Sequence, residues 1–156
     1  MLSDIYNSRI LQLAGNLPRV GRLPAPDGSA TAHSKLCGST VVVDVALDPE
    51  GRVADFAHDV KACALGQASS AIMAGGVIGA DADELRTLRD GMRAMLKAGA
   101  PPPSGGRWAD CAVLEPVRDY KARHASTLLT FDATLDAVEG AMRARGPTAA
   151  EPAATG

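Results

Sequence analysis

The spacing of apolar residues predicts a β-hairpin in the first half of the chain. Residues 40–47 alternate strictly, which places one set of side chains on a single face of a β-strand: Val41, Val43, Val45 and Leu47. The turn sequence Asp48-Pro49-Glu50-Gly51 follows, with Asp, Pro and Gly at the positions that a type I turn favours. A second alternating run, residues 52–60, is the expected partner strand. Its inward face would carry Ala54, Phe56, His58 and Val60.

Elsewhere the apolar residues recur every three to four positions, as in amphipathic helices. The first stripe runs from Leu2 to Leu13 and ends at Gly15. After the hairpin, an alanine-rich helix is expected from residue 64 to Gly75. Two further stripes cover residues 85–96, preceded by an Asp81 cap, and residues 128–142. Pro116 limits any helix that begins near Cys111 to one turn.

Three segments have no regular period. Residues 19–34 are rich in proline and glycine and are expected to form a loop or an irregular edge strand. Residues 100–106 (APPPSGG) are expected to form an exposed linker. We therefore predict an α+β fold, a small antiparallel sheet with helices packed on one face, over residues 1–145. Residues 146–156 are expected to be a disordered tail.

Composition and charge narrow the function. The 156 residues carry 16 basic and 18 acidic side chains, a net charge of −2, and only 3% are aromatic. This balance argues against binding to nucleic acid or to a membrane, because both demand positive charge or stacking platforms. Three widely spaced cysteines are an odd number without a C-x-x-C pair, which fits a reducing, cytoplasmic location with free thiols.

Two cysteines fall at the ends of predicted elements. Cys37 precedes the valine-rich strand, and Cys63 lies between the second strand and the alanine-rich helix, where a helix N-terminus favours a thiolate. The alternative is that each is a small buried hydrophobic residue.

The motifs around these cysteines resemble the U-type iron-sulfur cluster scaffolds, the family of IscU, SufU and the N-terminal domain of NifU. The run Leu36-Cys37-Gly38-Ser39 is similar to the C-G-D motif of that family. The run from Lys61 to Ala71 (KACALGQASSA) is similar to its second cysteine with a small-residue helix containing A-S-S. The resemblance extends from Tyr6 to about Val138 and is nearest to SufU-like members.

Two departures from the family pattern affect its ligand set of three cysteines and an aspartate. Ser39 stands where the family has its aspartate. For the third cysteine, one placement uses Cys111. The other, which we prefer, aligns the later segment with the family's A-R-x-x-C-A-T-L and puts Ser126, or Ala125, at the ligand position. Under that placement His124 is the nearest replacement donor.

The resemblance implies a carrier rather than an enzyme. Cys37 and Cys63 would receive sulfur from a cysteine desulfurase and hold iron, zinc or a transient [2Fe-2S] cluster, with His124 and Cys111 as further metal ligands. Recipient apo-proteins would take the product. A chaperone would bind Leu114–Arg118, which is similar to the L-P-P-V-K peptide. The alternative is a diverged paralogue that binds zinc structurally or regulates the desulfurase by contact alone.

Overall fold

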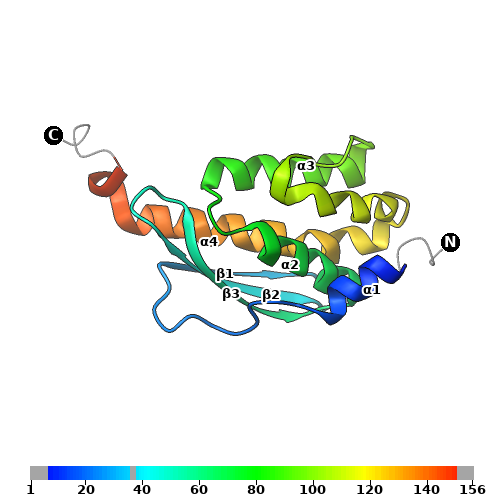
Figure 1. Ribbon diagram of the computed structural model, residues 1–156, viewed down its shortest axis with the longest axis horizontal. Coiled ribbons are helices and arrows are strands. Elements are labelled where there is room, and N and C mark those ends of the chain that lie inside the picture. The colour runs from blue at the N-terminus through cyan, green and yellow to red at the C-terminus, as the bar shows by residue number, and fades with distance from the viewer. Residues whose placement is uncertain (1–6, 36–37, 151–156) are drawn as a thin grey trace.

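The computed structural model describes residues 7–35 and 38–150, with side chains to residue 145. In chain order its elements are α1 (Ser8–Gly15), β1 (Gly28–His33), β2 (Thr40–Leu47), β3 (Val53–Lys61), α2 (Ala64–Gly76), α3 (Ala82–Ala98), the 3₁₀ segments η2 (Gly106–Asp119) and η3 (Lys121–Arg123), and α4 (His124–Ala150). The strands form one layer, and α2, α3 and α4 lie on the same side of it (Figure 1). The predicted α+β fold, a small antiparallel sheet with helices on one face, is confirmed.

The central strand β2 connects the sheet to the helical layer. Strand order is β1-β2-β3, and both pairings are antiparallel. Val41, Val43 and Val45 are fully buried, as their alternation predicted, and α4 packs across β1 and β2 on this face. The predicted turn is present, since the Gly51 amide donates to the Asp48 carbonyl at 3.0 Å.

A register shift in the hairpin changes one predicted inward residue. Phe56 pairs with Val45 across the β2–β3 ladder, so the middle of β3 faces the helices as expected. Near the turn the ladder slips by one residue, which brings Val53 into the core and leaves Ala54 exposed. The prediction that Ala54 faces inward was therefore wrong, because the extra residue of a β-bulge reverses the alternation beyond it.

Strand β1 is regular, although the sequence suggested a loop or an irregular edge strand. Its residues Gly28–His33 pair with β2 without interruption. A Cβ atom on Gly28 would collide with the Ala137 carbonyl and lie 2.9 Å from the Ala141 Cβ. Because α4 lies this close to β1, the strand needs small residues instead of the β-branched ones that identify strands in sequence.

A buried carboxylate holds the loop before β1 against the other face of the sheet. Asp44 is inaccessible to solvent and accepts hydrogen bonds from Arg22 Nε at 2.7 Å and Nη2 at 3.0 Å. It also accepts from Ser29 Oγ at 2.6 Å and from the Leu23 amide at 3.0 Å. The Arg22 contact holds the pKa of Asp44 below its usual value, so the carboxylate stays charged although it is buried.

The helices begin and end close to where capping signals place them. The Asn7 side chain accepts from the Ile10 amide and caps α1; the predicted apolar residues Leu2 and Tyr6 lie outside the described residues. Asp81 caps α3 in the same way, and Gly99 ends that helix at φ +71°. The helices predicted after the hairpin are therefore present with their apolar stripes inward, and of the first predicted helix the described part, α1, buries Ile10.

The C-terminal third contains one element that the sequence did not predict. A succession of 3₁₀ turns, η2, replaces the single predicted turn near Cys111 and continues through Pro116. Helix α4 reaches Ala150, so the first five residues of the predicted tail have helical backbone, and residues 151–156 lie outside the described ranges. These 3₁₀ turns still bury Trp108, Leu114 and Val117.

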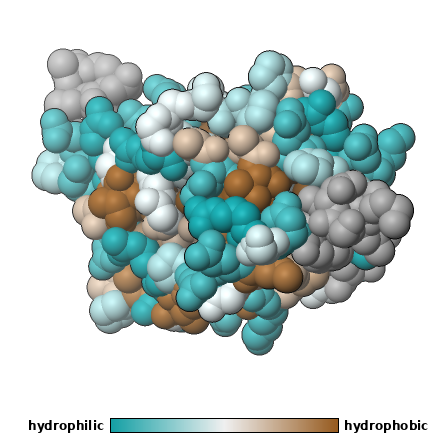
Figure 2. Space-filling model, turned by 45° about the vertical axis from the view of Figure 1, so that its right-hand side comes forward, coloured by the Kyte–Doolittle hydropathy of each residue, from teal (hydrophilic) through white to brown (hydrophobic). Residues whose placement is uncertain are grey.

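Over the described ranges, no helix combines the length and apolar character needed to cross a bilayer. On the face seen in Figure 2, apolar residues occur in separate patches between polar ones. The buried apolar side chains belong to one connected core, to which the sheet and the helices both contribute.

Candidate functional site

Cys63 lies at the junction between the sheet and the helical layer. It is the residue before α2, with extended backbone at φ −66° and ψ 174°, and its side chain makes no capping hydrogen bond. Its thiol is free and only partly buried. The first-turn amides of α2 and the thiol thus meet at one end of the sheet, as the sequence predicted.

Ser126 is the hydrogen-bond partner that the structure describes for this thiol. Cys63 Sγ lies 3.5 Å from Ser126 Oγ, which in turn donates to the Arg123 carbonyl at 3.2 Å. Ser126 belongs to the first turn of α4 and is 2% exposed. The residue that the preferred alignment put at the third ligand position thus lies beside Cys63, and its role as a ligand position stays a prediction.

A glycine brings these two helix starts together. A Cβ atom on Gly66 would lie 2.6 Å from the Ala62 Cβ and 3.3 Å from the Ser126 carbonyl oxygen. The absence of a side chain at Gly66 therefore leaves room for Ala62 and for the first turn of α4 beside it. The sequence analysis missed Gly66 as a site residue; its position three residues after Cys63, inside a run of small residues, was the available signal.

Cys37 itself lies outside the described residues, but the chain on both sides of it is described. The Ser34 amide donates to the Ser39 carbonyl at 2.9 Å, and the Gly38 amide donates to the Ser34 carbonyl at 2.8 Å. These bonds close the β1–β2 connection beside Thr40, which pairs with Lys61. The β1–β2 connection is therefore at the same end of the sheet as Cys63.

His124 is occupied by backbone contacts. It is 4% exposed, and its Nε2 lies 3.0 Å from the Val117 carbonyl oxygen and 3.1 Å from that of Arg118. Because carbonyl oxygens only accept, Nε2 carries the proton. The imidazole thus ties the start of α4 to η2, and a role as metal ligand stays a prediction that no described contact with Cys63 supports.

Cys111 lies in the hydrophobic core. It is 0% exposed, and burial raises the pKa of its thiol to about 12. Its neighbour Asp110 lines a cleft with Ala71 and Gly75 of α2. Those residues follow Cys63 by 8 and 12 positions, about 12–18 Å along a helix. The geometry therefore places Ser126, not Cys111, beside Cys63.

The described residues alone offer a metal ion too few ligands. Among residues 7–35 and 38–150, no three His, Cys, Asp or Glu side chains are grouped so that they could hold one. The donor set as described is one thiol and one hydroxyl.

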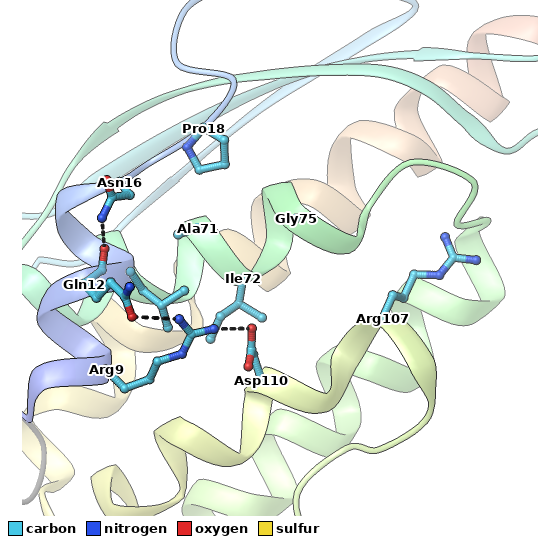
Figure 3. Close-up of a pocket in the computed structure, with 10 residues that line it drawn as sticks. Arg9, Gln12, Asn16, Pro18, Ala71, Ile72, Gly75, Arg107 and Asp110 are labelled. Carbon is cyan, nitrogen blue, oxygen red and sulfur yellow. Dashed lines mark hydrogen bonds and ion pairs between the residues drawn. The ribbon is translucent and has the colours of Figure 1, made fainter.

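A separate cleft of about 410 Å³ lies between α1, α2 and η2 (Figure 3). Its charged groups are already paired: Arg9 contacts Asp110 at 2.9 Å and Gln12 at 3.0 Å. Figure 3 shows the Arg107 side chain directed away from this ion pair. Among the described residues that line this cleft there is no thiol or imidazole.

Comparison with known proteins places this arrangement in a family. Residues 5–127 match the family described as NifU-like N terminal domain. The chain is similar to the crystal structure of a nitrogen-fixing NifU-like protein (N-terminal) from Brucella abortus, with 61% identity, coverage of 91% of this chain and 97% of that chain, and a TM-score of 0.87. No curated protein matches the chain.

More distant structures share the fold alone. A putative iron-sulfur cluster assembly scaffold protein for the SUF system, from thermophilic Fervidobacterium islandicum AW-1, is 19% identical, covers 87% of this chain and 98% of its own, and has a TM-score of 0.78. A hypothetical protein is 22% identical over 88% of this chain and 98% of its own, with a TM-score of 0.76. The match over residues 5–127 and the 61% identity to the Brucella abortus protein establish that the chain belongs to the NifU-like N-terminal domain family.

Proposed function

We propose that this protein serves iron-sulfur cluster assembly by accepting sulfur at Cys63 and passing it on. The observation that carries the proposal is a free, partly exposed thiol at the start of α2, at the sheet end where the Cys37-bearing connection also lies. Membership of the NifU-like family supports the same role. The similar Fervidobacterium protein carries the name of a scaffold for this process.

The transfer needs no oxidant or reductant other than the donor persulfide. The Cys63 thiolate attacks the terminal sulfur of a persulfide on a cysteine desulfurase. The S–S bond of the donor breaks as the new S–S bond forms, its electron pair stays on the donor thiolate, and the proton from Cys63 goes to that thiolate. Partial exposure of Cys63 lets the donor sulfur approach, whereas the core position of Cys111 excludes it.

Iron, zinc or a transient [2Fe-2S] cluster is the cargo of such a site. Cys37 and Cys63 would supply the thiolate ligands, because these metals prefer soft sulfur donors. His124 would act as a further metal ligand only after leaving the carbonyl oxygens of Val117 and Arg118, and Cys111 only after leaving the core. We propose a cytoplasmic location and apo-proteins as recipients. The chaperone role of Leu114–Arg118 has less support, since Leu114 and Val117 are fully buried.

Persulfide transfer from a cysteine desulfurase tests this proposal directly. With desulfurase, cysteine and stoichiometric protein, mass spectrometry should find one additional sulfur on the peptide that contains Cys63. The variant Cys63→Ser should lose it, and Cys111→Ala, the matched control at a buried thiol, should retain it. Sulfur acceptance that persists in Cys63→Ser and disappears in Cys37→Ser would move the acceptor role to Cys37. Acceptance by neither thiol would refute the proposal.

The same assay separates the alternative function. If the protein stimulates the desulfurase equally when both Cys37 and Cys63 are replaced by serine, contact alone accounts for its effect. Regulation of the desulfurase by contact would then replace sulfur acceptance as the proposed function.

A further inference from the structure

We propose that a cavity between the end of α3 and the start of α4 binds a small multivalent oxyanion such as inorganic phosphate. The cavity has a volume of about 340 Å³. It shares no lining residue with the cleft of Figure 3, and Cys63 does not line it. Its lining residues come from α3, η2, η3 and α4: Leu96, Lys97, Arg118, Lys121 and His124. The inference is independent of the proposed function, because it needs no sulfur transfer.

The first argument is the charge of the cavity lining. Three cationic side chains, Lys97, Arg118 and Lys121, converge on the cavity from three separate segments of the chain, and no described carboxylate lines it. Arg118 is paired with Glu115 at 2.6 Å. Within the described ranges, neither lysine ammonium group has an ion-pair or hydrogen-bond partner. Two positive charges thus remain uncompensated at one cavity, which favours an anion carrying more than one negative charge.

The second argument is the hydrogen-bonding capacity of Arg118. Its Nη2 donates to the Ala100 carbonyl at 3.3 Å and to Glu115 at 2.6 Å, which fixes the guanidinium in place. Its Nη1 has no acceptor among the described residues, and its Nε is buried without a partner. A guanidinium short of acceptors is suited to an oxyanion, because its planar N–H groups match the spacing of phosphate and carboxylate oxygens.

The third argument is that the inner wall of the cavity is fixed. His124 is buried, and its Nε2 donates to the carbonyl oxygens of Val117 and Arg118, which ties the start of α4 to η2. Leu96 belongs to the hydrophobic core and anchors the end of α3. Because these residues are held by packing and hydrogen bonds, binding of an anion would have to order only the two lysine side chains.

The surroundings of the cavity favour a small anion over a polyanion. Nucleic acids and anionic membranes bind to extended positive surfaces. Here the chain has a net charge of −2, and arginines elsewhere on the molecule are paired with carboxylates, as in Arg9–Asp110 and Arg93–Asp132. The unpaired positive charge at this cavity is therefore local, and it matches a ligand with the size of a phosphate ion.

The test is an NMR titration of the full chain with inorganic phosphate at constant ionic strength, balanced with sodium chloride. The amide signals of residues 97, 118, 121 and 124 should shift and saturate together. Lys97→Gln and Lys121→Gln should each weaken phosphate binding by about two- to fivefold, and the double variant on the order of tenfold. Lys61→Gln is the matched control: it removes the same charge from another exposed lysine, which does not line the cavity, and should leave the affinity unchanged.

Three outcomes would overturn the inference. One is the absence of any saturable shift with phosphate. Another is an equal loss of affinity in Lys61→Gln, which would show general attraction to positive charge instead of a site. The third is binding of an oligoglutamate peptide, but not of phosphate, at the same signals, which would make an acidic protein segment the occupant. Thermal unfolding checks that each variant is folded, and if Lys97→Gln is not, Lys121→Gln and its control decide the matter. Sulfur acceptance at Cys63 is measured separately, so either proposal can fail alone.

Discussion

Replacing either of two glycines in α2 by alanine is expected to change the stability of the protein in opposite directions. Gly66 faces the start of α4, where a Cβ atom would lie 2.6 Å from the Ala62 Cβ and 3.3 Å from the Ser126 carbonyl oxygen. Gly75, nine residues later in α2, is exposed and has no atom within 4 Å of an added Cβ. Gly66→Ala and Gly75→Ala therefore add the same methyl group to α2 in crowded and in open surroundings.

The magnitudes follow from two opposing terms. Replacing glycine by alanine within a helix stabilises the folded state by roughly 0.5–1 kcal/mol at either position. At Gly66, the added methyl group would collide with the Ala62 Cβ, just before α2, and would crowd the Ser126 carbonyl oxygen of α4, so neighbouring backbone must shift; overpacking of this kind costs about 1–3 kcal/mol. We expect Gly75→Ala to be more stable than the wild type by roughly 0.5–1 kcal/mol and Gly66→Ala to be less stable by up to about 2 kcal/mol.

Urea unfolding monitored by circular dichroism measures both variants, and the rate of Cys63 alkylation reports on the site. Only Gly66→Ala should change that rate. A Cβ atom at position 66 crowds Ala62 and Ser126, which lie beside Cys63, whereas one at Gly75 contacts nothing. Equal free energies of unfolding for the two variants would refute the crowding described around Gly66.

Three further predictions address other parts of the structure. Cys63 should react with a thiol reagent in the native state. Cys111 should react only on unfolding, because Cys111 is buried and its pKa is raised to about 12; equal rates would contradict the core position of Cys111. The pKa of Asp44 is lowered, so this carboxylate stabilises the fold fully above about pH 4 and loses its effect as the pH falls through its folded-state pKa. Asp44→Asn should be less stable than the wild type at pH 7 by about 1.5–3 kcal/mol, and the difference should shrink in acid. A difference that does not change with pH would argue against a charged role. Asp81→Ala should lower stability by about 1 kcal/mol by removing the cap of α3, which unchanged thermal unfolding would exclude.

The sequence predicted those elements whose side chains repeat with a clear period. The alternation over Thr40–Leu47 identified β2 with its observed bounds, because every second residue meets the helical layer. Strand β1 could not be recognised in this way. Position 28 must be glycine because the backbone of α4, more than 100 residues further along the chain, leaves no room for a Cβ atom there. The 3₁₀ turns of η2 were missed for a different reason. Their buried residues recur every three positions, at Trp108, Cys111, Leu114 and Val117, but Pro116 was taken to limit the segment to one turn.

The candidate site was predictable in part for a related reason. Position at the start of a helix pointed to Cys63, and the family alignment pointed to Ser126. Spacing along the chain could not show that Ser126 lies 3.5 Å from Cys63, because their contact joins residues 63 positions apart. The core location of Cys111 depends on the tertiary packing of η2 against α2, which local sequence does not encode.

Helix α4 also determines how the protein can be tethered for experiments. From Ser126 beside the thiol, the helix continues for 24 residues to Ala150, a span of about 36 Å. Figure 1 shows this helix running the length of the sheet toward the C-terminal end of the molecule. A fluorophore, a resin linker or a fused domain joined after Ala150 would thus be attached far from Cys63, and a sulfur donor could dock at the opposite pole of an immobilised molecule without obstruction.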